Sequence, residues 1–174
     1  LPGGDRRKGV SPKVISSVIP PPCTARLLIQ LAGTTAYIAV GAGTGPMELA
    51  ARLREEAARS DQRRVLVLAG APERTRTRAS DALAAAAIPP GETTYVGPGE
   101  GFRHETLGYS EADRLLGTSR TAVVYDCHGR CEPNTLGKLV GTVAAGGLLV
   151  VLVPPLSEWP ARRDGFDRSL AVPP

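Results

Sequence analysis

Short aliphatic runs alternate with stretches of helical periodicity along the chain. Runs of branched aliphatic residues predict strands, whereas apolar residues that recur every three or four positions predict helices with one buried face. The expected strands span residues 65–68, 93–96, 122–125 and 148–153, and the expected helices span 47–59, 77–87, 110–116 and 133–143. This alternation predicts an α/β fold: a three-layer, Rossmann-like domain with a mostly parallel sheet and right-handed crossovers.

The stretch from Thr121 to Pro155 has the clearest strand–helix–strand pattern. Its first apolar run ends at Asp126, and Pro133 suits the first turn of a helix, where its missing N–H is not needed. Leu148–Val153 is an uninterrupted aliphatic run, which is typical of a parallel strand buried on both faces. The Gly146–Gly147 pair before that run predicts a left-handed stop of the helix.

Near the beginning of the chain the pattern is weaker. Residues 27–31 and 36–40 are apolar runs that could pair as a hairpin or add an edge strand. Prolines punctuate the residues before them. The predicted organisation is a basic leader over residues 1–46, an α/β domain over 47–160, and a tail or the start of a linker over 161–174.

Composition limits the class of protein. The net charge of +4 arises within residues 1–40, which hold five cations and one anion, so the body of the domain is electrically neutral. Three cysteines without a disulfide framework favour a reducing compartment. No run approaches the roughly 18 apolar residues of a membrane span. A soluble, cytoplasmic protein without membrane contact is expected.

The loop after residues 122–125 carries the candidate chemistry. Asp126 stands at the carboxyl end of a predicted parallel strand, where open α/β sheets place their ligand sites. Its carboxylate could equally cap the turn that follows. His128, Arg130 and Asn134 come next along the chain and complete the candidate functional loop.

Two cysteines flank His128 in the sequence, at positions 127 and 131, and the three side chains are potential metal ligands. A structural zinc site requires four ligands, usually in paired clusters. No metal site is therefore predicted.

Gly41, Gly43 and Gly45 form a second candidate site between an apolar run and a helix. Such a position suits a nucleotide- or S-adenosylmethionine-binding loop, because glycines let the backbone approach a phosphate. A flexible joint into the helix is the other interpretation. The next strand ends in Ala69-Gly70, where a ribose-binding carboxylate would be expected, and the chain contains no GxxxxGK[ST] phosphate loop.

Two surface features complete the candidates. Arg74, Arg76 and Arg78 alternate along the chain and share no single helical face, which favours a solvated surface over an RNA contact. Trp159, in a polar segment near the end, is a candidate for packing or for contact with a partner.

The order and spacing of these motifs resemble the N-terminal domain of the tRNA(Met) cytidine acetyltransferase family, whose members make N4-acetylcytidine in RNA. The similarity extends from about Met47 to Pro155. The motifs that carry it are Arg63–Gly70, Leu115–Gly117, Val124–Asp126 with His128-Gly129, Pro133–Leu139, Gly141–Val143, Ala145–Gly147, the strand to Val153 with Pro154, and Glu158-Trp159.

The resemblance implies an accessory α/β domain. In such enzymes it precedes an ATP-dependent helicase-like module, an acetyl-CoA-dependent acetyltransferase module and a tRNA-binding tail. ATP and acetyl-CoA would bind to those modules, and no cofactor is expected in this chain. The implied role is non-catalytic: the domain would help to position tRNA or another RNA, or would pack against the partner modules.

Two other functions remain open. An S-adenosylmethionine-dependent methyltransferase, or another nucleotide-binding α/β enzyme, would use Gly41, Gly43 and Gly45. A purely structural interaction module would dock through the apolar surface around Trp159.

Overall fold

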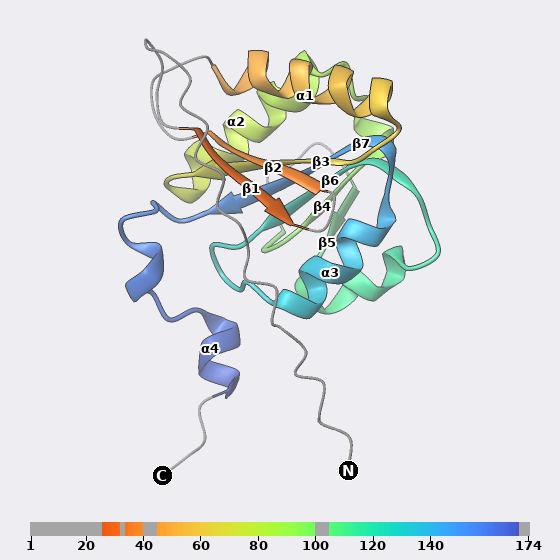
Figure 1. The fold of residues 1–174 in the computed structure, drawn as a ribbon. Coiled ribbons are helices and arrows are strands. Elements are labelled where there is room, and N and C mark those ends of the chain that lie inside the picture. Colours follow the sequence, from red (N-terminus) through yellow and green to blue (C-terminus); the bar gives the residue numbers. More distant parts are fainter. Residues whose placement is uncertain (1–25, 32–33, 40–44, 100–104, 171–174) are drawn as a thin grey trace, which may run out of the picture.

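The computed structural model describes residues 26–31, 34–39, 45–99 and 105–170. In this part of the chain, seven strands form one sheet with helices on both faces (Figure 1). The strands are β1 (Arg26–Leu31), β2 (Thr34–Ala39), β3 (Arg64–Ala69), β4 (Thr93–Val96), β5 (Glu105–Leu107), β6 (Arg120–Asp126) and β7 (Val143–Val153). The α-helices are α1 (Pro46–Ser60), α2 (Pro72–Ala85), α3 (Pro133–Thr142) and α4 (Gly165–Leu170), and the 3₁₀ helices are η1 (Pro90–Glu92), η2 (Tyr109–Leu115) and η3 (Trp159–Ala161). None of the described helices is long and apolar enough to cross a membrane.

The strand order in the sheet is β1-β2-β3-β7-β6-β4-β5. Neighbouring strands run parallel except β1 and β2, which pair antiparallel as a hairpin at one edge. The predicted α/β fold with a mostly parallel sheet is therefore confirmed. Of the two interpretations that the sequence leaves open for the first apolar runs, β1 and β2 correspond to the hairpin. The last long strand along the chain, β7, lies between β3 and β6 and joins the two halves of the sheet.

The first helix shows how the sequence pattern determines packing. Pro46 occupies its first turn, and one face is buried through Leu49, Ala50, Leu53 and Ala57. The helix is capped by Asp61, whose φ of 51° is left-handed and whose N–H donates to the carbonyl of Ala57.

Two apolar cores lie on opposite faces of the sheet. In Figure 1, α1 and α2 lie above the sheet, and α3 with the neighbouring η2 lies below it. The upper core includes Leu53, Leu83 and Val150, and the lower core includes Leu139 and Val151. The central strand β7 contributes to both cores because successive residues of a strand point to opposite faces.

The Gly146–Gly147 pair does not stop α3, contrary to the sequence prediction. β7 follows α3 directly, so the pair lies inside the strand. Gly146 has a φ of 75°, and the pairing of β7 with β6 shifts register between Arg120 and Ala122. The left-handed residue therefore forms a β-bulge instead of a helix cap. Side chains of Arg54 and Arg63 donate to carbonyls of this bulge.

The start of α2 also differs from the prediction. The helix begins at Pro72, five residues before the predicted start at Thr77. Proline is well suited to the first helical position, and Glu73 is favoured beside the positive end of the helix dipole.

Two smaller elements near the sheet edge were harder to predict. The three residues of β5 are too few to show a pattern in the sequence. The expected helix over 110–116 is the 3₁₀ helix η2. Its capping contact joins the Gly108 N–H to the Glu111 carboxylate at 3.0 Å.

The β7 bulge predicts a position-specific effect of adding one methyl group. A Cβ on Gly147 would lie 2.6 Å from the carbonyl oxygen of Thr121 and 2.8 Å from that of Ala144. Because backbone atoms cannot move aside cheaply, Gly147→Ala is expected to lower the free energy of unfolding by about 2 kcal/mol. Urea denaturation followed by circular dichroism measures this change.

Gly137→Ala is the matched control. This position lies in α3, and a Cβ there would meet nothing within 4 Å. Its higher helix propensity is expected to raise the free energy of unfolding by about 0.5–1 kcal/mol. Equal effects of the two substitutions would contradict the crowding at the bulge.

Candidate functional site

Four neighbouring strands end side by side at the edge of the sheet that we call the carboxyl edge. Gly70 follows β3, Gly97 follows β4, Asp126 ends β6, and Pro154 follows β7. These strands are consecutive neighbours in the sheet, in the order β3-β7-β6-β4. Asp126 therefore lies where its position in the sequence predicts.

The Asp126 carboxylate is completely buried and accepts four hydrogen bonds. Oδ1 accepts from the backbone N–H of His128 at 2.9 Å and faces its ring Nδ1 at 2.7 Å. Oδ2 accepts from the Tyr95 hydroxyl at 2.7 Å and from Nε of Arg76 at 2.9 Å. These donors fill the roughly four acceptor positions of a carboxylate. The predicted turn cap is confirmed, and we call these four side chains the Asp126 network.

The network keeps Asp126 ionised. Burial raises the pKa of this carboxyl, but hydrogen bonds from His128, Tyr95 and Arg76 outweigh burial and lower the pKa from 3.8 to about 2. Burial, together with the bond to Asp126, raises the pKa of the Tyr95 hydroxyl, which therefore stays a donor. Burial lowers the pKa of Arg76, but its bond to Asp126 and the nearby charges more than offset this, and the net shift is upward.

Both ring nitrogens of His128 face oxygen acceptors. Nδ1 faces the Asp126 carboxylate, and Nε2 is 2.9 Å from the carbonyl oxygen of Gly70. Because a carboxylate and a carbonyl can only accept, the ring satisfies both contacts only when each nitrogen carries a proton. A second carboxylate, that of Glu73, lies 3.0 Å from Arg76 and adds negative charge on the solvent side.

Gly97 lies against the network at a point where no side chain fits. A Cβ there would lie 2.7 Å from Cβ of Asp126 and 2.8 Å from the hydroxyl oxygen of Tyr95. Both neighbours are held by their hydrogen bonds, so neither can retreat. The close approach therefore requires glycine.

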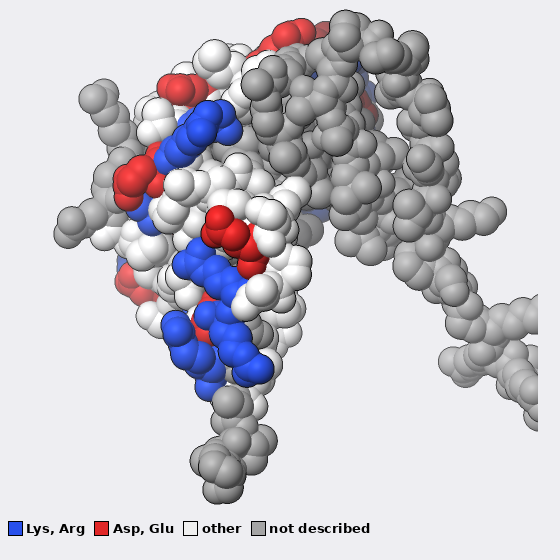
Figure 2. All heavy atoms as spheres, turned by 90° about the vertical axis from the view of Figure 1, so that its left-hand side faces the viewer, with Lys and Arg blue, Asp and Glu red and all other residues white. Residues whose placement is uncertain are grey.

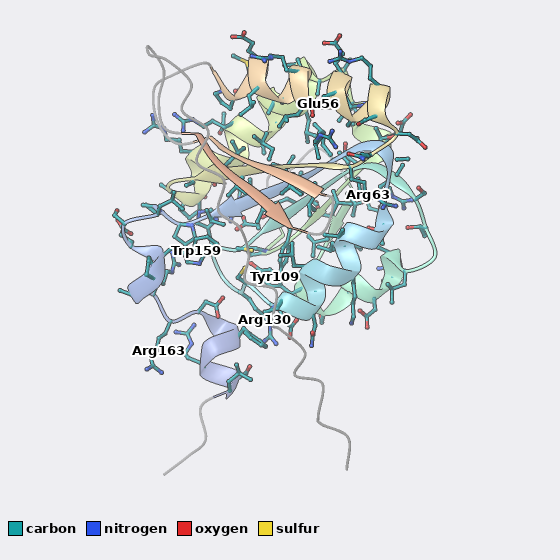
Figure 3. All side chains as sticks on the ribbon, viewed as in Figure 1. Glu56, Arg63, Tyr109, Arg130, Trp159 and Arg163 are labelled. Atoms are coloured by element: carbon teal, nitrogen blue, oxygen red, sulfur yellow. The ribbon has the colours of Figure 1, made fainter. Side chains whose placement is uncertain are left out.

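The C-terminal segment, residues 154–170, lies beside the loop that follows Asp126 (Figure 3). Nη2 of Arg162 donates to the carbonyl of His128 at 2.8 Å, and the Gly165 N–H donates to the carbonyl of Gly129 at 3.1 Å. The Asp164 carboxylate accepts from the backbone N–H of Cys131. Each of these bonds uses the backbone of the loop, so they fix its path whatever its side chains are.

Two aromatic residues support the same loop. The Tyr109 hydroxyl donates to the carbonyl of Asp126 at 2.7 Å, and burial, followed by the charge of Asp126, raises its pKa to about 12. The Arg130 guanidinium lies 6.0 Å from the centre of the Phe166 ring and forms an ion pair with Glu132 at 3.0 Å. Figure 3 shows Tyr109 and Arg130 on the α3 side of the sheet.

The other predicted site residues lie apart from the Asp126 network. Asn134 is exposed on the first turn of α3, and Trp159 is 37% exposed in η3. Gly45 is the N-cap of α1, while Gly41 and Gly43 lie outside the described residues. The structure thus brings together Asp126 and His128, with Arg130 in the same loop.

The predicted solvated surface is wrong for Arg76. Its side chain is only 18% exposed because it reaches the carboxyl edge and pairs with Asp126. Arg74 is exposed and Arg78 is partly exposed.

Sequence reasoning missed three members of the site. Tyr95 and Gly97 flank the end of a predicted strand, so their position at the carboxyl edge could have been inferred. The role of Arg76 depends on the start of α2 at Pro72, which the prediction placed too late.

The cysteines beside His128 do not form a zinc-like cluster with it. Both nitrogens of His128 are engaged by Asp126 and Gly70. A hydrogen bond with Cys131 and burial raise the pKa of the Cys127 thiol, whereas a metal-binding thiol must lose its proton. Among the described residues, no three His, Cys, Asp or Glu side chains are arranged to hold a metal ion.

Comparison with known proteins assigns the family. The family described as tRNA(Met) cytidine acetyltransferase TmcA, N-terminal, matches residues 46–174. The chain belongs to this family. The resemblance found in the sequence is therefore confirmed, and β1 and β2 lie before the range that matches the TmcA N-terminal family.

Three relatives, each named tRNA(Met) cytidine acetyltransferase TmcA, show the extent of the similarity. The protein of Haloarcula marismortui is 52% identical over 138 residues, which are 79% of this chain and 18% of the relative. That of Haloferax volcanii is 50% identical over 126 residues, covering 72% and 17%. That of Nitrosococcus halophilus is 32% identical over 120 residues, covering 67% and 15%. The chain spans less than a fifth of the length of these TmcA relatives.

The Asp126 network predicts a large cost for removing one charge. In Asp126→Asn, an amide N–H₂ would face donors where a carboxylate oxygen now accepts, and Arg76 would lose its buried counter-ion. The free energy of unfolding is expected to fall by about 3 kcal/mol. Asp113→Asn is the control, because its pair with Lys138 is exposed and is worth less than about 1 kcal/mol. Chemical denaturation of both variants tests the difference, and similar losses would contradict the central role of Asp126.

The same carboxylate predicts an acid limit. Since the folded-state pKa of about 2 lies below the ordinary value of 3.8, Asp126 contributes stability that is fully present above pH 3.8 and is lost as the pH falls through 2. A pKa lowered from 3.8 to about 2 corresponds to roughly 2 kcal/mol of stability. Unfolding free energies measured between pH 5 and pH 2 should fall more steeply for the wild type than for Asp126→Asn. Parallel curves would show that other groups determine the acid limit.

Proposed function

We propose that this chain is a non-catalytic accessory domain of an ATP- and acetyl-CoA-dependent tRNA(Met) cytidine acetyltransferase, and that it contributes to RNA positioning and to packing between modules. The observation that carries the proposal is the filled carboxyl edge. At the position where α/β sheets commonly bind ligands, Asp126 and His128 are buried and fully engaged with Tyr95, Arg76 and Gly70. Their bonding supports a structural role for this edge.

The cofactors of the parent enzyme do not fit the residues at this edge. A bound nucleotide phosphate is favoured by backbone N–H groups at a helix start, but the first turn of α2 carries the acidic Glu73, and the Gly70 carbonyl before it faces His128. The chain contains no Walker-type phosphate loop either. We therefore assign ATP and acetyl-CoA to other modules of the parent enzyme.

RNA contact is supported by exposed arginines around the carboxyl edge. Arg74 on α2, and Arg163 and Arg168 on the C-terminal segment, are exposed and form no ion pair with another described residue. Figure 3 shows that Arg163 points away from the sheet. Figure 2 views the molecule from the left-hand side of Figure 1. On the lower part of this side, basic side chains are gathered, with a few acidic ones between them. Such guanidinium groups suit the RNA phosphate backbone.

An RNA-modifying enzyme of this family would work on tRNA in the cytoplasm, and we propose that location for this chain. The proposed partners are tRNA and the helicase-like and acetyltransferase modules of the parent enzyme.

The first expected result concerns catalysis. The purified 174-residue chain should neither hydrolyse ATP nor transfer an acetyl group from acetyl-CoA to tRNA, because we assign both cofactor sites to other modules of the parent enzyme. Phosphate release and radiolabelled acetyl transfer are the measurements, with the full-length parent enzyme as the positive control. Turnover by the isolated chain that is lost in a fully folded point variant of this chain would overturn the proposal.

The second expected result concerns tRNA affinity. Combined Arg163→Glu and Arg168→Glu substitutions in the parent enzyme should weaken tRNA binding several-fold. They should also reduce the slope of log affinity against log salt by about one for each lost phosphate contact. Combined Arg52→Glu and Arg59→Glu substitutions, at exposed positions of α1, are the charge-matched control. If the control weakens binding equally, the arginines of the C-terminal segment have no specific role.

A further inference from the structure

The face of the sheet below β3 is less well covered than the face above it. Residues 64, 66 and 68 of β3 point toward α1 and α2 and are at most 4% exposed. Val65, Val67 and Ala69, which point the other way, are only partly buried. Parallel strands in α/β proteins are normally covered on both faces. The alternation in burial along β3 therefore marks a gap in the lower helical layer that the described residues form.

The helix α3 forms one wall of this gap. Thr135, Leu139 and Thr142 are buried against the sheet. On one flank of the helix, Lys138 forms an ion pair with Asp113 of η2 at 2.6 Å. Leu136 and Val140, one turn apart on the opposite flank, are partly buried and so face the side away from η2.

These partly buried side chains all pack against the lower core, and we call the surface that they contribute the open face. Its members are aliphatic, and each is partly buried against the lower core: Val65, Val67, Ala69, Leu136, Val140 and Leu156. None of the six carries a charge or a hydrogen-bonding side chain. The surface is therefore suited to an apolar protein segment and unsuited to RNA, which requires cations.

The dimensions of the gap indicate what covers it. Neighbouring strands are about 4.8 Å apart, and packed helices are about 8–10 Å apart. One helix therefore covers about two strands. In the lower layer α3 lies over β6 and β7, so the next two strands in the order, β3 and β2, leave room for one more helix beside α3.

The size of the parent enzyme indicates where that helix comes from. The relatives are more than five times as long as the part that this chain matches, because the match covers 18% or less of each. The described chain leaves the sheet at Val153 and continues through α4, which lies on the α3 side of the sheet (Figure 1).

We propose that the open face binds one amphipathic helix supplied by the part of the parent enzyme outside this domain. The helix lies beside α3 and places aliphatic side chains against Val67 and Val140. This inference rests on the proposed function, because it names the surface through which the accessory domain packs against another module.

Hydrogen–deuterium exchange detected by mass spectrometry tests the proposal. Peptides covering residues 64–69 and 136–140 are compared between the 174-residue chain and the full-length parent enzyme. Exchange in both peptides should be at least about tenfold slower in the full-length enzyme, because the docked helix must leave before these amides open. A peptide covering residues 49–57 of α1 is the internal control and should change little. Unchanged exchange at residues 64–69 and 136–140 would overturn the proposal.

Point substitutions separate docking from folding. Val67→Glu and Val140→Glu in the full-length enzyme should abolish the added protection, since each places a charge against the docked helix. Leu116→Glu, at a position that is 53% exposed next to η2, is the control and should retain the protection. The Val140 side chain lies on the outer flank of a helix, so Val140→Glu should leave the melting temperature of the isolated chain within a few degrees of the wild type. Protection that survives both substitutions would overturn the proposal.

Two further outcomes are distinguishable. If the isolated chain dimerises and protects the same peptides, a second copy covers the open face and the proposed helix is wrong. If the isolated chain acetylates tRNA, the proposed accessory function fails while the exchange result still decides the docking. Slow exchange only in the full-length enzyme supports the docked helix whichever catalytic result is obtained.

Discussion

A buried carboxylate must regain from the protein the hydrogen bonds that it loses with water. At the carboxyl edge, this constraint determines which side chains surround Asp126. Leaving such a charge unpaired would cost several kcal/mol. The donors that prevent this come from β4, α2 and the loop after β6, and two of them lie 31 and 50 residues away in the sequence. One side chain therefore fastens together elements that the chain forms far apart. Gly97 has no side chain, and this leaves room for the side chains of Asp126 and Tyr95.

The filled edge also explains how a fold associated with ligand binding can serve a different purpose. In open α/β sheets the ends of parallel strands commonly leave a crevice. Here Tyr95 and His128 occupy that space, and Arg162 ties the C-terminal segment to the loop above them. The polar side chains at this edge are hydrogen-bonded within the protein. The edge is therefore bonded internally, and under the proposed function the exposed arginines and the aliphatic side chains elsewhere contact other molecules.

The sequence predicts those features whose cause is local. Burial on both faces makes Leu148–Val153 recognisable as a central strand, and the position of Asp126 follows from the end of its own strand. The partners of Asp126 depend on topology, because β7 must lie between β3 and β6 before the start of α2 comes near the site. The bulge at Gly146 was misassigned for a related reason: a left-handed glycine after a helix is usually a cap, and only the register with β6 distinguishes the two.

The hydrogen bonds between the C-terminal segment and the loop have a consequence for the mechanics of a multidomain enzyme. Residues between Val153 and Gly165 resemble a linker in composition, yet Arg162, Asp164 and Gly165 are each bonded to the loop at the carboxyl edge. The segment is therefore held to the loop at residues 162–165. Under the proposed function, a force transmitted through α4 acts first on the backbone of residues 128–131, and only then on the sheet.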